Sequence, residues 1–213
     1  MAEQYFTDQT FTQADYAKQG LAKGEYENCT FKQIDLSGAD LSHSHFIDCR
    51  FEHCQLSNAK LHKTVVRDVV FNDCKMSGLV FSDCDGFLFS AQFIQCQLQY
   101  ASFQQMKLKQ HVFQDCQLQD ADFTQADCSG AKFSGADLSR TIFHQTNLEG
   151  ADFSTAVHFS IDPEQNRLKK AIFSQMKQCL NDINIVHIIG RIDIDEVILI
   201  LRLIPHKFMY SHC

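Results

Sequence analysis

Cysteine is the residue type whose number and spacing in this sequence first suggest chemistry. The 213 residues include ten cysteines, and thiolates can bind zinc or pair as disulfides. Three pairs are 20 residues apart, namely Cys29/Cys49, Cys54/Cys74 and Cys96/Cys116. No spacing gathers four cysteine or histidine ligands as a tetrahedral zinc site requires. We therefore interpret these cysteines as small buried hydrophobic residues and predict no metal site.

Histidine and serine offer no stronger indication of catalysis. His43, His45 and His53 are close in the sequence, but the repeat described below places them outward on different corners, as surface residues. Serine is abundant, yet the sequence has no Gly-x-Ser-x-Gly nucleophile motif and no glycine-rich phosphate loop. We predict that the protein is not an enzyme and that it has no catalytic residues and no cofactor.

The sequence that positions these cysteines and histidines repeats with a period of five residues. A large apolar residue, here called the centre, recurs at every fifth position from Phe6 to Phe81 and again from Leu88 to Phe153, where only Cys128 is unusual. Of the 19 phenylalanines, 14 occupy centres. The residue two positions earlier is usually Ala or Cys, and Asp or Asn often directly precedes the centre. Neither an α-helix nor a flat strand has this period, so the pattern indicates a solenoid with a packed interior and no pocket.

This pattern resembles the pentapeptide-repeat family over about residues 4–160. The resemblance implies an all-β solenoid, a right-handed quadrilateral β-helix in which each unit of five forms one side and four units complete a coil. The centre and the small residue two positions before it then point inward, and the other three point outward. Thirty units give about 7–8 coils, which stack at about 4.8 Å into a rod of roughly 36 Å.

Two regions are predicted, a repeat domain over 1–160 and a C-terminal segment over 161–213. The repeat domain has a register break at 82–88, because Phe81 and Leu88 are seven residues apart instead of five. We expect a surface bulge in which Gly86 permits a turn and either Phe87 or Phe89 lies near the surface. The bulge is either a tolerated insertion or a contact for a partner.

The C-terminal segment departs from the repeat. After Phe153 the next centre is His158, which marks a frayed end, although Ala171 and Phe173 repeat the inward spacing once more. An apolar stripe predicts a short helix that caps the last coil, and its residues are Met176, Leu180 and Ile183. The resemblance implies that such a helix can join two rods tail to tail in a homodimer. The role of residues 186–213, as a dimer interface or an extension, is left open.

Charge and hydropathy narrow the class of partner. The net charge of -7 argues against direct binding to nucleic acid. The N-terminus lacks the basic and apolar stretches of a signal peptide, and no apolar run is long enough to span a bilayer. We therefore expect a cytoplasmic protein with no membrane contact. Residues 1–158 hold 20 acidic and 12 basic residues, a net of -8, so the acidity belongs to the rod.

One predicted corner of the rod concentrates acidic residues. Asp8, Asn28, Asp48 and Asp68 are 20 residues apart, so they stack in a column if the register holds. Stacked like charges cost stability, which favours a partner, although Asp and Asn also suit turns. The candidate partner-binding residues are Asp8, Asp48, Asp68, Asp83, Asp85 and Phe87.

An acidic rod of this kind resembles the Qnr-type quinolone-resistance proteins. That resemblance implies a protein that binds DNA gyrase or topoisomerase IV as a mimic of duplex DNA and protects it from quinolones. Duplex DNA carries about 21 charges over 36 Å, against a net of -8 here, so mimicry requires the acidic residues to gather on one face. The alternatives are a structural scaffold or protein-binding module with no topoisomerase role, and a metal or redox protein that uses the stacked cysteines.

Overall fold

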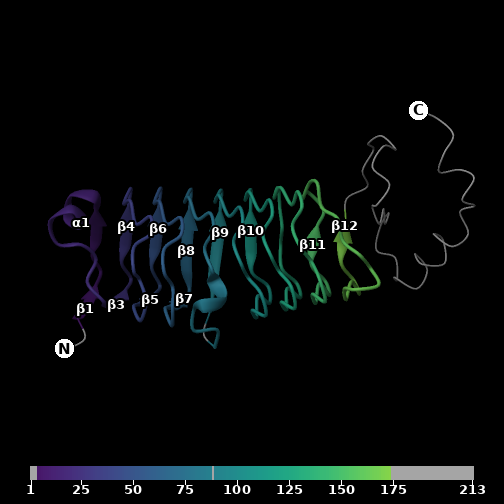
Figure 1. Ribbon diagram of the computed structural model, residues 1–213, viewed down its shortest axis with the longest axis horizontal. Coiled ribbons are helices and arrows are strands. Elements are labelled where there is room, and N and C mark those ends of the chain that lie inside the picture. Colours follow the sequence, from purple (N-terminus) through teal and green to yellow (C-terminus); the bar gives the residue numbers. More distant parts are fainter. Residues whose placement is uncertain (1–3, 88, 174–213) are drawn as a thin grey trace, which may run out of the picture.

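The chain winds into a β-solenoid of about eight turns. The computed structural model describes residues 4–87 and 89–173, and in it the coils follow one another along a straight rod with the N-terminus at one end (Figure 1). The predicted helix with Met176, Leu180 and Ile183 lies outside the described residues, as does the segment 186–213.

Two parallel sheets form two sides of the rod. The first has the order β1-β3-β5-β7 and the second the order β10-β9-β8-β6-β4-β2, while β11 and β12 pair near the C-terminal end of the described chain. The bounds are β1 Gln4–Thr7, β2 Thr10–Thr12, β3 Gly24–Glu27, β4 Thr30–Lys32, β5 His45–Ile47, β6 Arg50–Glu52, β7 Val65–Arg67, β8 Val69–Asn72, β9 Ala91–Ile94, β10 Val112–Gln114, β11 Asp152–Phe153 and β12 Ile172–Phe173. Elsewhere single parallel bridges join neighbouring coils.

The strand register follows the 20-residue coil. Phe11 pairs with Phe31, and Phe93 with Phe113. Between these pairs, Phe71 pairs with Phe93, 22 residues away. The two additional residues therefore fall between β8 and β9, within the segment that contains the short 3-10 helix η1 (Phe81–Asp83).

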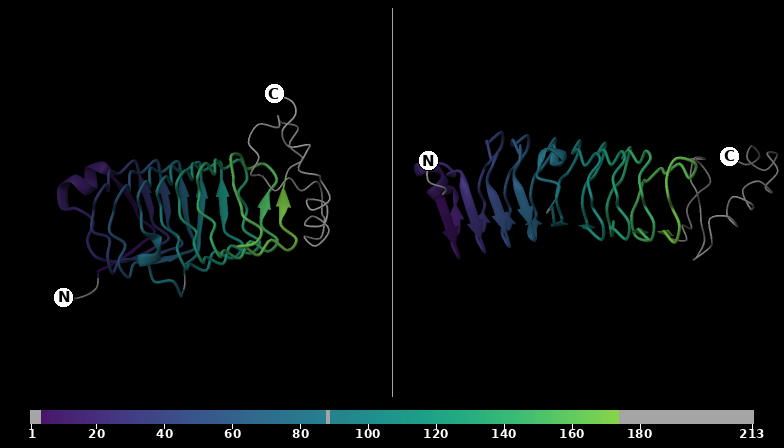
Figure 2. Two further views of the ribbon diagram at one scale, coloured as in Figure 1. Left: turned by 45° about the vertical axis from the view of Figure 1, so that its right-hand side comes forward. Right: turned by 90° about the horizontal axis from the view of Figure 1, so that it is seen from below.

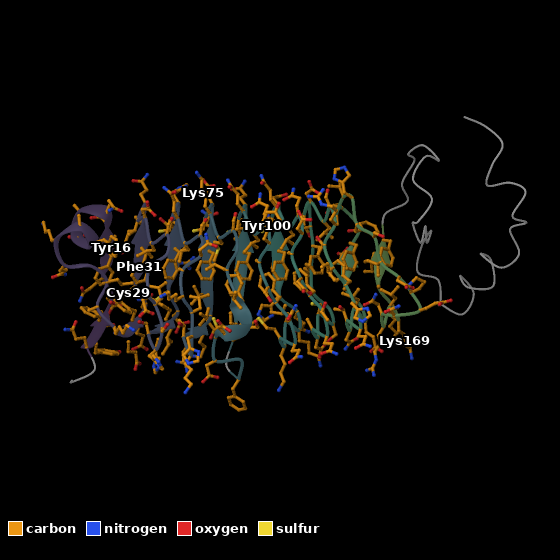
Figure 3. All side chains as sticks on the ribbon, in the orientation of Figure 1. Tyr16, Cys29, Phe31, Lys75, Tyr100 and Lys169 are labelled. Carbon is orange, nitrogen blue, oxygen red and sulfur yellow. The ribbon has the colours of Figure 1, made fainter. Side chains whose placement is uncertain are left out.

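Stacked phenylalanine rings fill the interior. One column runs along the whole rod, with successive ring centroids 4.5 to 5.4 Å apart, and its members are Phe11, Phe31, Phe51, Phe71, Phe93, Phe113, Phe133, Phe153 and Phe173. A second column meets it edge to face, as at Phe103 and Phe113, whose centroids are 5.5 Å apart. Such pairs add stability beyond the burial of their area. Figure 3 shows the rings aligned along the axis of the rod.

The corners explain the residues that follow each centre by two positions. The backbone there has a positive φ, for example 53° at Asp48, 55° at Gln95 and 66° at Gly130. Gly, Asn and Asp adopt this left-handed conformation most readily. About half of these corner residues are Gly, Asn or Asp, and the others include Gln, His, Lys, Arg and Tyr.

The first coil differs from the prediction. Tyr16 and Leu21 are centres of the sequence repeat, but residues Gln13–Gln19 form the helix α1 instead, and both side chains are only partly buried. Thr12 and Asp15 make a capping box at the N-terminus of α1. This capping box satisfies backbone N–H groups in the first turn of the helix. α1 replaces part of the first coil at the N-terminal end (Figure 1).

The stacked pattern continues past residue 160. Asn147 bridges to Arg167, and Ile172–Phe173 pairs with Asp152–Phe153. Leu168 and Phe173 are buried, whereas His158 points outward with a φ of 56°. Residues 161–173 thus continue the stacking of the solenoid.

Candidate interaction surface

The lower side of the rod in Figure 1 gathers most of the predicted partner-binding residues. We call it the lower face, and it consists of β1, β3, β5 and β7, then the loop 83–90, then the segments 107–110, 127–130, 147–150 and 167–170. Lys107, Asp127, Asn147 and Arg167 bridge from coil to coil along its C-terminal half. Figure 2, right, views this face directly.

The acidic column stacks at one edge of the lower face, as its spacing predicts. Asp8, Asn28, Asp48 and Asp68 all have a φ of 52° to 54° and are exposed. The Asn28 amide donates to Asp8 at 2.5 Å, and the Ser90 hydroxyl donates to Asp68 at 2.9 Å. A shallow hollow of about 580 Å³ follows this column and is also lined by Glu27. The edge therefore presents three carboxylates on four successive coils.

The loop 83–90 projects from the middle of the lower face. Phe87 is 85% exposed, whereas Phe89 is buried, so Phe87 is the one that lies at the surface. The Asp85 carboxylate accepts the backbone N–H of Phe87 at 3.0 Å and holds the turn. Leu88, the predicted centre, lies outside the described residues. A hollow of about 440 Å³ beside the loop is lined by Phe87 and by residues 104–107.

A buried histidine supports the loop from the next coil. The ring of His111 stacks on that of Phe89 at 5.6 Å and 8°. Its Nε2 accepts the backbone N–H of Ala91 at 3.4 Å, and its Nδ1 lies 3.3 Å from the carbonyl oxygen of Lys109. Both contacts are satisfied by the neutral ring with the proton on Nδ1. Burial lowers the pKa of His111.

This arrangement predicts a loss of stability in acid. Because the pKa of His111 is lowered in the folded state, its contribution is present above the unfolded value of about 6.5 and is lost as the pH falls below it. We expect the melting temperature of the protein to fall more between pH 7.5 and pH 5 than that of His111→Gln. Thermal unfolding followed by circular dichroism measures the difference, and parallel pH profiles would contradict the role of His111.

The eight cysteines within the described residues line the interior of the rod. Cys29, Cys49, Cys54, Cys74, Cys84, Cys96, Cys116 and Cys128 are all buried. Most thiols donate to a carbonyl oxygen of the preceding coil, as Cys54 does to Phe31 at 3.3 Å. Thr64 and Thr146 make the same bond. Burial raises the pKa of Cys49 and Cys84 to about 12, so these thiols stay protonated at neutral pH.

The histidines of the first coils lie on the surface. His53 is paired with Asp73 at 2.8 Å, and His45 lies 3.9 Å from Glu25. His43 contacts His62 edge to face with 5.6 Å between ring centroids. Within residues 4–87 and 89–173 no three His, Cys, Asp or Glu side chains come together as a metal site would need. In the same ranges no helix is long and apolar enough to cross a membrane.

Most of the charged residues on the lower face were not among the candidates from the sequence. Glu25 and Glu27 face outward on β3, and the C-terminal half carries Lys107, Lys109, Arg167, Lys169 and Lys170. Lys169 points from the lower side in Figure 3. The 20-residue spacing of positions 107, 127, 147 and 167 indicates that they stack in one column. Only the register across the loop assigns this column to the same face as Asp8 and Asp48.

Comparison with known proteins agrees with this geometry. The model of pentapeptide repeats matches eight copies over residues 27–62 and 116–154. Over these two segments the chain carries pentapeptide repeats. Among solved structures, the chain is similar to trypsin-treated QnrB1 R167E, a plasmid-mediated fluoroquinolone resistance protein, with 20% identity, a TM-score of 0.54 and coverage of 81% of this chain and 90% of that one.

A second similar structure is HetL from Nostoc, a pentapeptide repeat protein involved in heterocyst differentiation regulation. It has 18% identity and a TM-score of 0.46, with coverage of 81% of this chain and 85% of that chain. No protein of curated function matches the sequence. At these identities the likeness to QnrB1 establishes the fold, and the partner must be argued from the surface of this chain.

Proposed function

We propose that this pentapeptide-repeat protein is a non-enzymatic protein that binds another protein through the acidic edge of its lower face. The observation that supports this proposal is the column of Asp8, Asp48 and Asp68 beside the projecting Phe87. Carboxylates at a fixed spacing attract a basic groove, and an exposed aromatic side chain supplies an apolar anchor. Asp83 and Asp85 precede that anchor in the chain and are themselves exposed.

The partner that we propose is a type II topoisomerase, DNA gyrase or topoisomerase IV, which the protein protects from quinolones. The fold shared with a fluoroquinolone resistance protein supports this choice. Four coils of about 4.8 Å span about 19 Å, a length over which duplex DNA carries about 11 charges. The same length of the lower face holds five carboxylates, Asp8, Glu25, Glu27, Asp48 and Asp68. We therefore expect salt-sensitive binding that is weaker than the binding of duplex DNA.

The test measures supercoiling and ciprofloxacin-stabilised cleavage by gyrase and topoisomerase IV with the full-length protein. We expect the protein to relieve drug inhibition and the variant Asp48→Asn/Asp68→Asn to need at least about tenfold more protein, because one lost charge contact costs about 1 kcal/mol or more. Asparagine keeps the left-handed corner, so the fold is preserved.

The matched control is Asp73→Asn/Asp115→Asn. These residues occupy another corner with φ of 50° and 52°, so the change in net charge and backbone conformation is the same. It should protect like the parent protein. Equal loss in both variants would assign the effect to net charge alone. No effect of the parent protein on either enzyme would leave a protein-binding scaffold with a different partner.

A further inference from the structure

The two halves of the lower face carry opposite charge. The N-terminal half has five carboxylates, Asp8, Glu25, Glu27, Asp48 and Asp68, and one cation, Arg67, for a net of 1 - 5 = -4. The C-terminal half has five cations, Lys107, Lys109, Arg167, Lys169 and Lys170, and two anions, Asp127 and Glu149, for a net of 5 - 2 = +3. At the adjoining corner of the N-terminal half, Lys23 is paired with Asp40 at 2.8 Å, and Lys63 adds one further cation.

We propose that the lower face binds the lower face of a second copy of this chain, turned end for end. A two-fold axis across the rod brings the acidic half of each copy onto the basic half of the other, as an isologous interface requires. The inference concerns self-association and goes beyond the proposed function.

One register of the two copies places two pairs of unlike charges directly opposite each other. When the coil of Tyr26 faces the coil of Leu168, Glu25 lies opposite Arg167 and Glu27 opposite Lys169. These pairs follow because a two-fold axis across the rod reverses the order of the coils but not the direction along each strand. A residue just before the centre of one coil therefore faces a residue just before the centre of the opposite coil. Opposite charges across such an interface fix register and favour association. Each contact occurs twice in the dimer.

At the remaining positions of this register no further ion pair lies directly opposite. Asp48 lies opposite Gly150 and Asp68 opposite Gly130, whose φ of 66° marks the same corner without a side chain. His45 faces Asn147, and Arg67 faces Ser129. No two like charges of the described residues are directly opposite. The carboxylates of Asp48 and Asp68 therefore face glycines, which have no side chain, on the other copy.

The projecting loop lies near the two-fold axis in the same register. Phe87 of each copy comes over the coil of Leu108 of the other, beside the hollow of about 440 Å³ that Met106 and Lys107 help to line. Asp85 then approaches the lysines at 107 and 109. The exposed ring thus gains an apolar contact at the centre of the interface, where such contacts contribute most.

The dimensions predict a weak dimer. Eight facing coils extend about 38 Å, and three or four residues of extended chain are about 12 Å wide. This strip is smaller than the standard interface of about 800 Å² on each partner. We expect dissociation constants in the micromolar range that rise with salt. Since the dimer covers Phe87, it competes with a protein bound at the same face.

Sedimentation velocity of the full-length protein at about 20 mM and about 500 mM salt tests the proposal. We expect dimers at low salt and monomers at high salt. Glu25→Lys/Glu27→Lys and Arg167→Glu/Lys169→Glu should each be monomeric at low salt, with dimerisation weakened at least tenfold. An equimolar mixture of these two variants should dimerise again, because every reversed pair is complementary in the heterodimer.

The control Asp73→Lys/Asp115→Lys alters the charge equally at another corner and should dimerise like the parent. Circular dichroism shows whether each variant is folded. A parent protein that is monomeric at low salt would overturn the proposal. So would a dimer that survives in both reversed variants, since that dimer uses another surface such as the C-terminal segment. The gyrase assay with Asp48→Asn/Asp68→Asn decides the proposed function separately, because these two residues lie outside the ion pairs of the dimer.

Discussion

Phe113→Asp is expected to unfold the solenoid. The ring of Phe113 is fully buried and lies between Phe93 and Phe133, each 5.2 Å away, with Phe103 and Phe123 at its edges. An aspartate there has no partner, and an unpaired buried charge costs more than about 4 kcal/mol, a large part of the 5–15 kcal/mol that stabilises a domain. Circular dichroism and limited proteolysis at neutral pH measure the result.

The neighbouring coils cannot compensate for this change. Each coil of a solenoid is stabilised chiefly by its two neighbours, so a disrupted coil separates the rod into two shorter pieces. Gln114→Asp is the control, because Gln114 is exposed on the same strand, β10. It should melt close to the parent protein. A Phe113→Asp protein that melted with its control would show that the assigned register is wrong.

Phe103→Ala is expected to lower the free energy of unfolding by about 3–5 kcal/mol. Phe103 is fully buried and stacks on Phe81 at 4.7 Å and on Phe123 at 4.8 Å. Removing the ring leaves a cavity between two rings that the backbone bonds of adjacent coils hold in place. At about 2–4 °C for each kcal/mol in a chain of this size, the melting temperature should fall by about 6–20 °C.

The matched control for this cavity is Phe87→Ala. The same atoms are removed, but Phe87 is 85% exposed, so the melting temperature should change by no more than about 2 °C. Equal shifts for the two variants would mean that the inward ring at 103 contributes no more than a surface ring. That outcome would contradict the stacked core.

The repeat in the sequence was sufficient to predict the core. A large residue at every fifth position, with Ala or Cys two positions before it, can be buried only if the chain turns a corner every five residues. The stacked column from Phe11 to Phe153 and the buried cysteines at 54, 74, 96 and 116 follow from that rule. The physical reason is local, because each unit alone specifies which two of its five side chains point inward.

Two departures within the rod required the tertiary structure. Around Tyr16 a helix, α1, forms in place of a side of the coil. The capping box of Thr12 and Asp15 favours this helix, and the end coil has a neighbouring coil on only one side. At the loop, the sequence left open whether Phe87 or Phe89 is exposed. His111, one coil further along, decided it by stacking on Phe89.

By itself the sequence determined the solenoid, its inward residues and the column of Asp8, Asn28, Asp48 and Asp68, since all of these depend on a spacing of five or 20. Only the tertiary structure decided what each face presents as a whole. The two-residue insertion shifts the numbering between β8 and β9, so the side that Lys107 and Lys169 share with Glu25 depends on how the loop is accommodated. Outward side chains are not packed against one another, so the sequence alone does not assign them to a common face. The hydrogen bonds between stacked coils make that assignment.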